Sequence, residues 1–374
     1  MSLVTARKEG QFIYLISDTH LTDSDVLPNE SRPDRPQMVS DPRDSAIKIT
    51  LLQPQIAVAF AGGSAFADDA IQQCRNRPLA DVARILLQSN IDATNKVEYI
   101  IAVGAPIFDL IAIKDGKIAY GQQNAWIGDS DAFNFYQEKL SEIKEQDINH
   151  IHENLYYCQQ ALKAVIESSK FPTINGIQIT VDNKSGQFAY QQIISTEILP
   201  YTFSGTGPQS IIIGHGSPQD GGYTVNICPD PRLPDILPVH ILQGNIGIIY
   251  KSKNNGLLHP EILPDTDDIE FAEILLQRFG IPIRYRISAP IKSYFNRGIK
   301  ALQKGDTSTA IAFFTKGLQE PGPELKSLLH LNLSSALYFS GQTASAFQHA
   351  QEAIRLDPKT YDQWLNIVSK GQHS

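Results

Sequence analysis

The sequence predicts an α+β domain followed by an all-α segment. In the first part of the chain, predicted strand pairs flank two predicted helices, which is the order of a four-layer αββα sandwich. After Pro290 only helices are expected, and small residues recur at a fixed spacing. We therefore expect two domains, residues 1–287 and 288–374.

Residues 5–63 are predicted to form strands, apart from one loop between the second and third of them. A polar strand, a turn at Glu9-Gly10 and an apolar strand ending at Asp18 form one hairpin. Residues 48–62 predict a second hairpin, turned at Pro54, because proline fixes φ for a turn. The Pro-rich loop 23–43 between the hairpins is expected to be lid-like or poorly ordered.

The rest of the first domain mixes helices and strands. Apolar residues at helical spacing predict helices at 69–88, 133–145 and 148–168. Further strands are expected at 99–102, 108–119, 177–181, 188–194, 210–213, 224–228 and 246–251. The Pro-rich segment 229–238 is expected to be able to gate a site.

The last part of the chain contains an internal repeat. Gly305 and Gly341 are 36 residues apart, and His330 and Trp364 are 34 apart. The pattern resembles the tetratricopeptide family, whose period is about 34 residues, and the alternative is an ordinary helical bundle. The resemblance implies about two and a half repeats over 288–374, ending in a short capping helix that carries Trp364.

Composition narrows the class of protein. The 374 residues carry a formal charge of −8, which argues against a nucleic-acid surface. Three scattered cysteines and the lack of a long apolar run predict a cytoplasmic protein without disulfides or a membrane segment. Nothing in the sequence calls for a cofactor or a resident metal.

Four partial motifs, in order, resemble the proteasome β-subunit family of N-terminal-nucleophile (Ntn) hydrolases. The most informative is the run that opens at Lys48, turns at Pro54 and ends at Gly62-Gly63. The others are the stretch around Asp18-Thr19, the segment 125–133, and 219–226. The resemblance covers roughly residues 1–250 and implies a peptide or amide-bond hydrolase whose α-amino group acts as base. It also implies homo-oligomers.

The resemblance implies specific site residues. Lys48 matches the buried lysine, Asp18 the acid that orients it, and Gly62 an oxyanion donor. Counting back from Asp18 reaches Ser2 as nucleophile, whereas counting back from the Gly10 turn reaches Met1. Removal of Met1 would free the Ser2 amine, but the natural start could also lie near Val4. Three expected site residues depart from the family pattern: Asp129, Ser217 and Asp220.

Two other functions stay open. In the first, the sandwich is an inactive scaffold for protein–protein interaction, with Lys48 and Asp18 as a relict ion pair. In the second, Asp18-Thr19-His20 at the end of a strand resembles the first metal-binding motif of calcineurin-like metallophosphoesterases. Ala132 stands where that family would need an acid, which makes this the remote alternative.

The repeats predict a binding surface. Stacked helix pairs leave a concave groove, and Asn296, Lys300 and Asn332 are expected to face it. These residues make only a partial clamp for a carboxylate. We therefore expect either capture of a protein or peptide, or intramolecular docking on the chain's own first domain.

Overall fold

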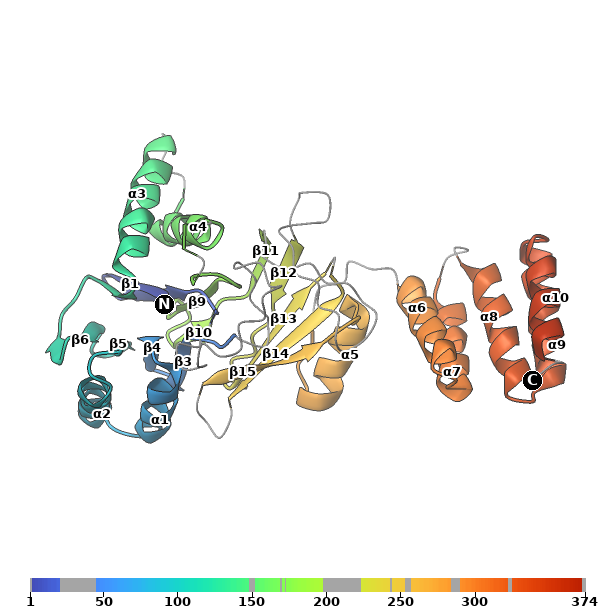
Figure 1. The fold of residues 1–374 in the computed structure, drawn as a ribbon, viewed down its shortest axis with the longest axis horizontal. Helices are drawn as coiled ribbons and strands as arrows, with labels where there is room; N and C mark the ends of the chain where they lie inside the picture. Colours follow the sequence, from blue (N-terminus) through green and yellow to red (C-terminus); the bar gives the residue numbers. More distant parts are fainter. Residues whose placement is uncertain are drawn as a thin grey trace, which may run out of the picture. The chain divides into compact units, whose positions relative to one another are not determined.

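The computed structural model describes residues 2–20, 45–147, 152–168, 170–171, 173–197, 223–242, 244–252, 257–283, 290–321 and 325–371. The chain divides into two compact units, Met1–Thr266 and Asp267–Ser374, each described by itself below (Figure 1). No helix among the described residues is both long enough and apolar enough to cross a membrane.

The first sheet is antiparallel and contains the start of the chain. Its order is β10-β9-β2-β1-β8. The bounds are β1 (Leu3–Glu9), β2 (Phe12–Ser17), β8 (Asn124–Gly128), β9 (Ile179–Asp182) and β10 (Ala189–Tyr190). Val4 pairs with Ser17, which brings the beginning of β1 beside the end of β2.

The second sheet is also antiparallel and follows the chain order. Its strands are β3 (Ile49–Gln53), β4 (Ile56–Gly62), β5 (Val97–Val103), β6 (Asp109–Lys114) and β7 (Lys117–Ala119). The predicted hairpin over 48–62 is therefore present, with its turn at Pro54-Gln55.

Each of these sheets has one face against helices and one against other strands. The helices are α1 (Ser64–Cys74) and α2 (Leu79–Asp92) on the second sheet, and α3 (Ser130–Gln146) and α4 (Asn154–Ile166) on the first. On β2, Tyr14 packs toward α3 and α4, whereas Leu15 joins the core shared by the sheets, because successive side chains alternate. Helices α3 and α4 thus pack on the first sheet and α1 and α2 on the second, and the two sheets share a core (Figure 1).

The single helix expected over 69–88 is wrong. The structure has two helices, separated by Arg75–Pro78. Pro78 stands at the N-cap of α2 and disfavours helical backbone at Arg77 before it. The helix expected from residue 148 begins at Asn154.

A third sheet was not predicted as such, although the strands expected at 224–228 and 246–251 are two of its members. It is an antiparallel meander of β11 (Ile193–Glu197), β12 (Tyr223–Ile227), β13 (Ile236–Ile241), β14 (Ile246–Ser252) and β15 (Leu258–Leu263). Pro238 and Pro260 lie inside strands, where proline is normally a signal against one. Val225, Val239 and Ile248 from this sheet join the core of the other two. The expected strand 210–213 and the expected loop 23–43 lie outside the described residues.

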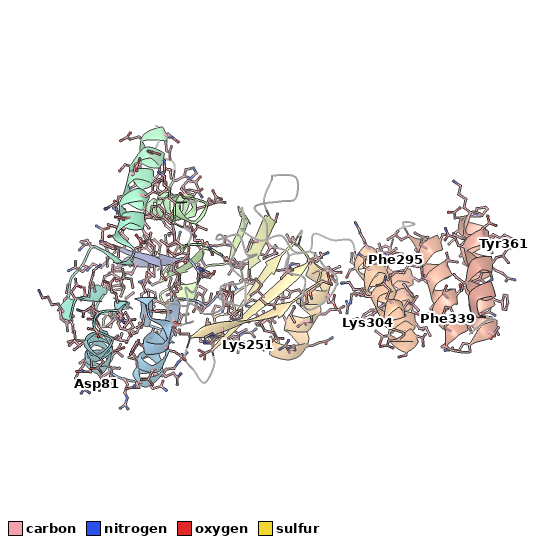
Figure 2. The ribbon with its side chains drawn as sticks, viewed as in Figure 1. Asp81, Lys251, Phe295, Lys304, Phe339 and Tyr361 are labelled. Carbon is pink, nitrogen blue, oxygen red and sulfur yellow. The ribbon has the colours of Figure 1, made fainter. Side chains whose placement is uncertain are left out.

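In the second unit the described residues form helices and the turns between them. Its helices are α5 (Asp268–Phe279), α6 (Pro290–Gln303), α7 (Thr307–Gln319), α8 (Lys326–Phe339), α9 (Thr343–Leu356) and α10 (Thr360–Gly371). Phe314, Leu333 and Trp364 share one core along α6–α10. A Cβ at Gly298 would lie 2.3 Å from the Phe314 ring, so glycine allows α6 and α7 to cross closely. Phe339 and Tyr361 remain on the surface, with exposures of 54% and 50% (Figure 2).

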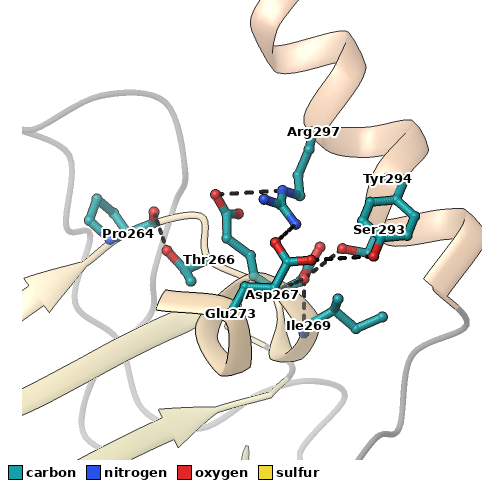
Figure 3. Close-up of polar contacts among 9 residues, drawn as sticks. Pro264, Thr266, Asp267, Ile269, Glu273, Ser293, Tyr294 and Arg297 are labelled. Atoms are coloured by element: carbon teal, nitrogen blue, oxygen red, sulfur yellow. Dashed lines mark hydrogen bonds and ion pairs between the residues drawn. The ribbon is translucent and has the colours of Figure 1, made fainter. Parts of the chain in front are cut away.

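Helix α5, which the sequence analysis did not predict, is tied to α6 by polar contacts. Ser293 Oγ donates to Asp267 Oδ1 at 2.8 Å, and Arg297 Nη1 donates to Glu273 Oε2 at 2.8 Å (Figure 3). The Tyr294 hydroxyl also donates to Glu273, at 3.3 Å. These contacts place α5 in the same compact unit as α6, and the expected domain boundary after residue 287 stays a prediction.

Candidate active site at the open end of the first hairpin

The candidate site is built around a buried ion pair. Lys48 Nζ donates to Asp18 Oδ2 at 2.6 Å, and neither side chain is exposed to solvent. Asp18 directly follows β2, and Lys48 directly precedes β3, so the pair joins the two inner sheets. Two charges at this depth cost several kcal/mol in lost hydration, which only good geometry offsets.

The electrostatics of the pair are set by burial. Loss of water raises the pKa of Asp18, and the charge and hydrogen bond of Lys48 oppose that shift. Loss of water likewise lowers the pKa of Lys48, and Asp18 opposes it. Each partner therefore keeps the other charged, and removal of either leaves an uncompensated group in the interior.

The carboxylate of Asp18 also binds the backbone on both sides. Oδ1 accepts from the Leu3 N–H at 3.3 Å, and Oδ2 accepts from the His20 N–H at 3.2 Å. Ser2, with an exposure of 4%, is therefore held one residue away from the ion pair. The structure thus brings Ser2, Asp18 and Lys48 together.

Lys48 is positioned by backbone contacts from two distant parts of the unit. The Ala46 N–H donates to Thr19 O at 2.9 Å, and the Ile47 N–H donates to Leu258 O at 3.1 Å. The segment before Lys48 therefore lies between the end of β2 and the start of β15. Ser45 Oγ and the Tyr250 hydroxyl, 3.2 Å apart, add a side-chain contact to the third sheet.

The Ser2 backbone is held by the end of β8. The Asp129 N–H donates to Ser2 O at 2.9 Å. Gly128, with φ of 105°, approaches so closely that a Cβ there would lie 1.9 Å from Ser2 O and 3.3 Å from Ala61 Cβ. Gly128 was not among the predicted site residues, although the Gly-Asp pair before a helix was visible in the sequence.

The Asp129 carboxylate faces its own helix. Oδ1 accepts from the Asp131 N–H at 2.9 Å and the Ala132 N–H at 3.0 Å, which caps α3. Asp129 therefore contacts Ser2 through its backbone N–H, while its carboxylate accepts hydrogen bonds from N–H groups at the start of α3.

Gly62 ends β4 with φ of 100°. A Cβ there would lie 2.0 Å from Lys96 O, so the backbone by itself requires glycine. Its role as an oxyanion donor stays a prediction. Ser217 and Asp220, the remaining predicted site residues, lie outside the described residues.

His20 lies beside the ion pair, where the Asp18 carboxylate is already engaged by other donors. Burial, followed by the positive charge of Lys48, lowers the pKa of His20 to about 4. The Asp18 carboxylate already accepts hydrogen bonds from the Lys48 ammonium and from the backbone N–H groups of Leu3 and His20. Within the described ranges there is no group of three His, Cys, Asp or Glu side chains arranged to hold a metal ion. These contacts count against the metallophosphoesterase alternative.

A separate hollow lies away from the candidate site. It has a volume of about 930 Å³ and is lined at the turn of the first hairpin by Glu9, Gln11 and Phe12, together with Lys144 and Lys184. Ser2 and Asp18 stand at the opposite, open end of that hairpin. This hollow is therefore not part of the candidate site.

Comparison with known proteins gives likenesses among solved structures. No protein-family model and no curated protein matches the chain. The structure is similar to the crystal structure of eukaryotic HslV from Trypanosoma brucei, with 14% identity and a TM-score of 0.33. The likeness covers 48% of this chain and 98% of that one. At this TM-score it carries no argument about the site, which rests on the contacts above.

Proposed function

We propose that the first unit is an αββα sandwich of the Ntn-hydrolase type and that it hydrolyses an amide or peptide bond with Ser2 as nucleophile. The observation that carries the proposal is the fully buried Lys48–Asp18 pair, whose carboxylate also holds the N–H of Leu3. An apolar pair of similar size would stabilise a core as well or better. The retention of two charges beside Ser2 therefore supports a chemical role.

The chemistry requires a free amine at Ser2, once whatever precedes it has been removed. That amine takes the proton of Ser2 Oγ as the oxygen attacks the substrate carbonyl, and then delivers it to the leaving amine. Water then hydrolyses the acyl ester and regenerates the hydroxyl. The ammonium of Lys48 favours the neutral, basic form of the amine, and Asp18 keeps Lys48 in place. The N–H of Gly62 is proposed to bind the oxyanion.

The test begins with mass spectrometry of the native protein's first residue. A free Ser2 is expected, and an intact or acetylated Met1 contradicts the mechanism. An epoxyketone that reacts with adjacent hydroxyl and amine groups should then label the wild type and Ser2→Thr but not Ser2→Ala.

The role of Lys48 needs a variant that still folds. Asp18→Asn combined with Lys48→Met removes both charges together, so no unpaired charge is left in the core. We expect circular dichroism like that of the wild type and no labelling. Lys139→Met, which removes a lysine at an exposed ion pair with Glu142, is the matched control and should label normally. Labelling that survives loss of Lys48 refutes the proposal.

An inactive scaffold is the second candidate. It is favoured by Asp129, whose carboxylate caps α3 at a place where the resembled family carries a serine near the nucleophile. The same experiment separates the two: a free Ser2 amine without labelling supports the scaffold.

We further propose that α6–α10 form about two and a half tetratricopeptide repeats that bind a protein or peptide. The close crossing at Gly298 supports this, because small residues at repeat positions allow helix pairs to stack. Of the groove residues, Asn332 Nδ2 already donates to Leu328 O of its own helix at 2.8 Å, and the charge of Lys300 acts on Glu270 of α5. Hydrogen exchange of the full chain against the isolated repeats tests the alternative: protection of the amides near Asn296 and Asn332 only in the full chain favours intramolecular docking.

A further inference from the structure

Two histidines of neighbouring helices meet nitrogen to nitrogen in the second unit. His330 Nδ1 on α8 and His349 Nδ1 on α9 are 2.9 Å apart. The ring centroids are 5.1 Å apart and the planes differ by 29°, so the rings meet at their nitrogen edges. At this distance one nitrogen donates and the other accepts. Neither the proposed hydrolase site nor the repeat core uses this pair.

The surroundings of the pair are charged and partly open to water. Both rings are half-buried. The Glu352 carboxylate, one turn beyond His349 on α9, lies close enough for its charge to act on both imidazoles. Arg355 binds both oxygens of that carboxylate, at 2.8 and 2.6 Å. Lys326 on α8 is the other cation whose charge reaches His330.

We propose that His330, His349 and Glu352 bind a divalent transition metal ion, with zinc as the representative, between α8 and α9. Imidazole nitrogen and carboxylate oxygen are ligands that zinc takes in proteins, and three protein ligands plus water complete a tetrahedral shell. The two helices supply these donors from one side of their interface.

Binding requires both rings to rearrange. At a metal–nitrogen distance of about 2.0–2.1 Å, two nitrogens of a tetrahedral site are about 3.3 Å apart. The Nδ1 atoms are 2.9 Å apart and face each other, so each ring would have to rotate away from the other and break their hydrogen bond before both nitrogens could point at one ion. The third ligand is not preformed, consistent with the lack of a ready three-ligand group in the described ranges. Glu352 would have to break its ion pair with Arg355 before it could bind the metal. This ion pair lies at the surface, where such pairs contribute little stability.

A metal here would join the two helices of the last complete helix pair. Ser327 Oγ already donates to Ala353 O at 3.1 Å across the same interface. The metal would add a second link and stabilise the end of the repeat unit. The inference is independent of Ser2 and of any hydrolase activity.

The experiment is calorimetric titration of the full-length, chelator-treated protein with zinc chloride at pH 7.5. We expect one equivalent to bind and the melting temperature of the helical unit to rise. His330→Gln and His349→Gln should each weaken binding by at least about tenfold, as loss of a metal partner typically does. The control is His152→Gln, which removes a histidine outside the pair and should bind zinc like the wild type. Calcium chloride, whose ion prefers oxygen ligands, should give no heat.

Two further variants test the third ligand. Glu352→Gln should weaken zinc binding, whereas Arg355→Gln, which releases the carboxylate, should strengthen it. Circular dichroism checks that each variant is folded. The proposal is overturned if the wild type binds no zinc, or if both histidine variants bind zinc as tightly as the wild type. Either result would leave the two histidines as a hydrogen-bonded pair without a metal.

Discussion

Gly128 lies directly against the carbonyl of Ser2: a Cβ at position 128 would stand 1.9 Å from Ser2 O. Gly128→Ala should therefore displace the start of β1, in addition to straining a backbone with φ of 105°. We expect a loss of at least about 2–3 kcal/mol in the free energy of unfolding, more than an incompatible glycine replacement costs by itself. Urea unfolding measures it.

Gly121→Ala is the matched control for that prediction. Gly121 also has positive φ, at 69°, but nothing lies within 4 Å of its Cβ position. It should cost only about 1 kcal/mol, the strain of the backbone alone. Equal losses in the two variants would show that the contact with Ser2 adds nothing.

Replacing one partner of the buried ion pair should destabilise the first unit more than replacing both partners. Lys48→Met leaves the Asp18 carboxylate buried without its partner, and we expect about 3–5 kcal/mol of destabilisation at pH 7. The double variant with Asp18→Asn should recover most of this loss. Chemical denaturation of the two variants and the wild type provides the comparison, and a double variant no more stable than Lys48→Met contradicts the assignment.

The first unit should become less stable at acidic pH, because His20 binds a proton more readily in the unfolded chain than in the folded one. Its pKa is about 4 in the folded chain and 6.5 as the ordinary value, so the folded state disfavours the proton. The contribution is present in full above pH 6.5 and is lost as pH falls toward 4. For this group alone we expect about 2 kcal/mol less stability at pH 5 than at pH 8. His20→Asn should remove this part of the pH dependence, as measured by unfolding at both pH values.

The thermal stability of the helical unit should depend on α5. A fragment of residues 267–374 keeps the contacts of Asp267 with Ser293 and of Glu273 with Arg297, whereas a fragment of 288–374 loses them. The longer fragment is expected to melt at the higher temperature. Arg297→Met in the longer fragment should remove part of the difference, because the carboxylate of Glu273 loses its charged partner and keeps the Tyr294 hydroxyl. Identical melting of the two fragments would place the boundary after 287 instead.

The parts of the fold that sequence predicted well are those with short-range signals. The run from Lys48 to Gly62 carries its own turn and glycine end, so the hairpin and the position of the lysine follow from adjacent residues. The approach of Ser2 to Asp18 follows from the tight turn at Gly10, which fixes the pairing of β1 with β2. Residues close in sequence are enough to predict these two features.

Other features were missed because their cause is tertiary or because a local signal was passed over. Strands β13 and β15 contain Pro238 and Pro260, and their existence depends on burial of neighbours such as Val239 against the other sheets. By contrast, α5 carries a readable cap, Asp267, and a left-handed Gly280 at its end. Asp129 was assigned to the site although an aspartate before a helix is a common cap.

The contact between Ile47 and Leu258 ties the order of synthesis to the assembly of the site. Lys48 follows a residue whose backbone pairs with the start of β15, near the C-terminal end of the first unit. On the ribosome, β1, β2 and β3 emerge long before Leu258 does, so Lys48 lacks one of its two flanking supports until almost the whole unit has been made. The ion pair beside Ser2 is therefore completed late, and a nascent or truncated chain that ends before β15 should not carry a finished site.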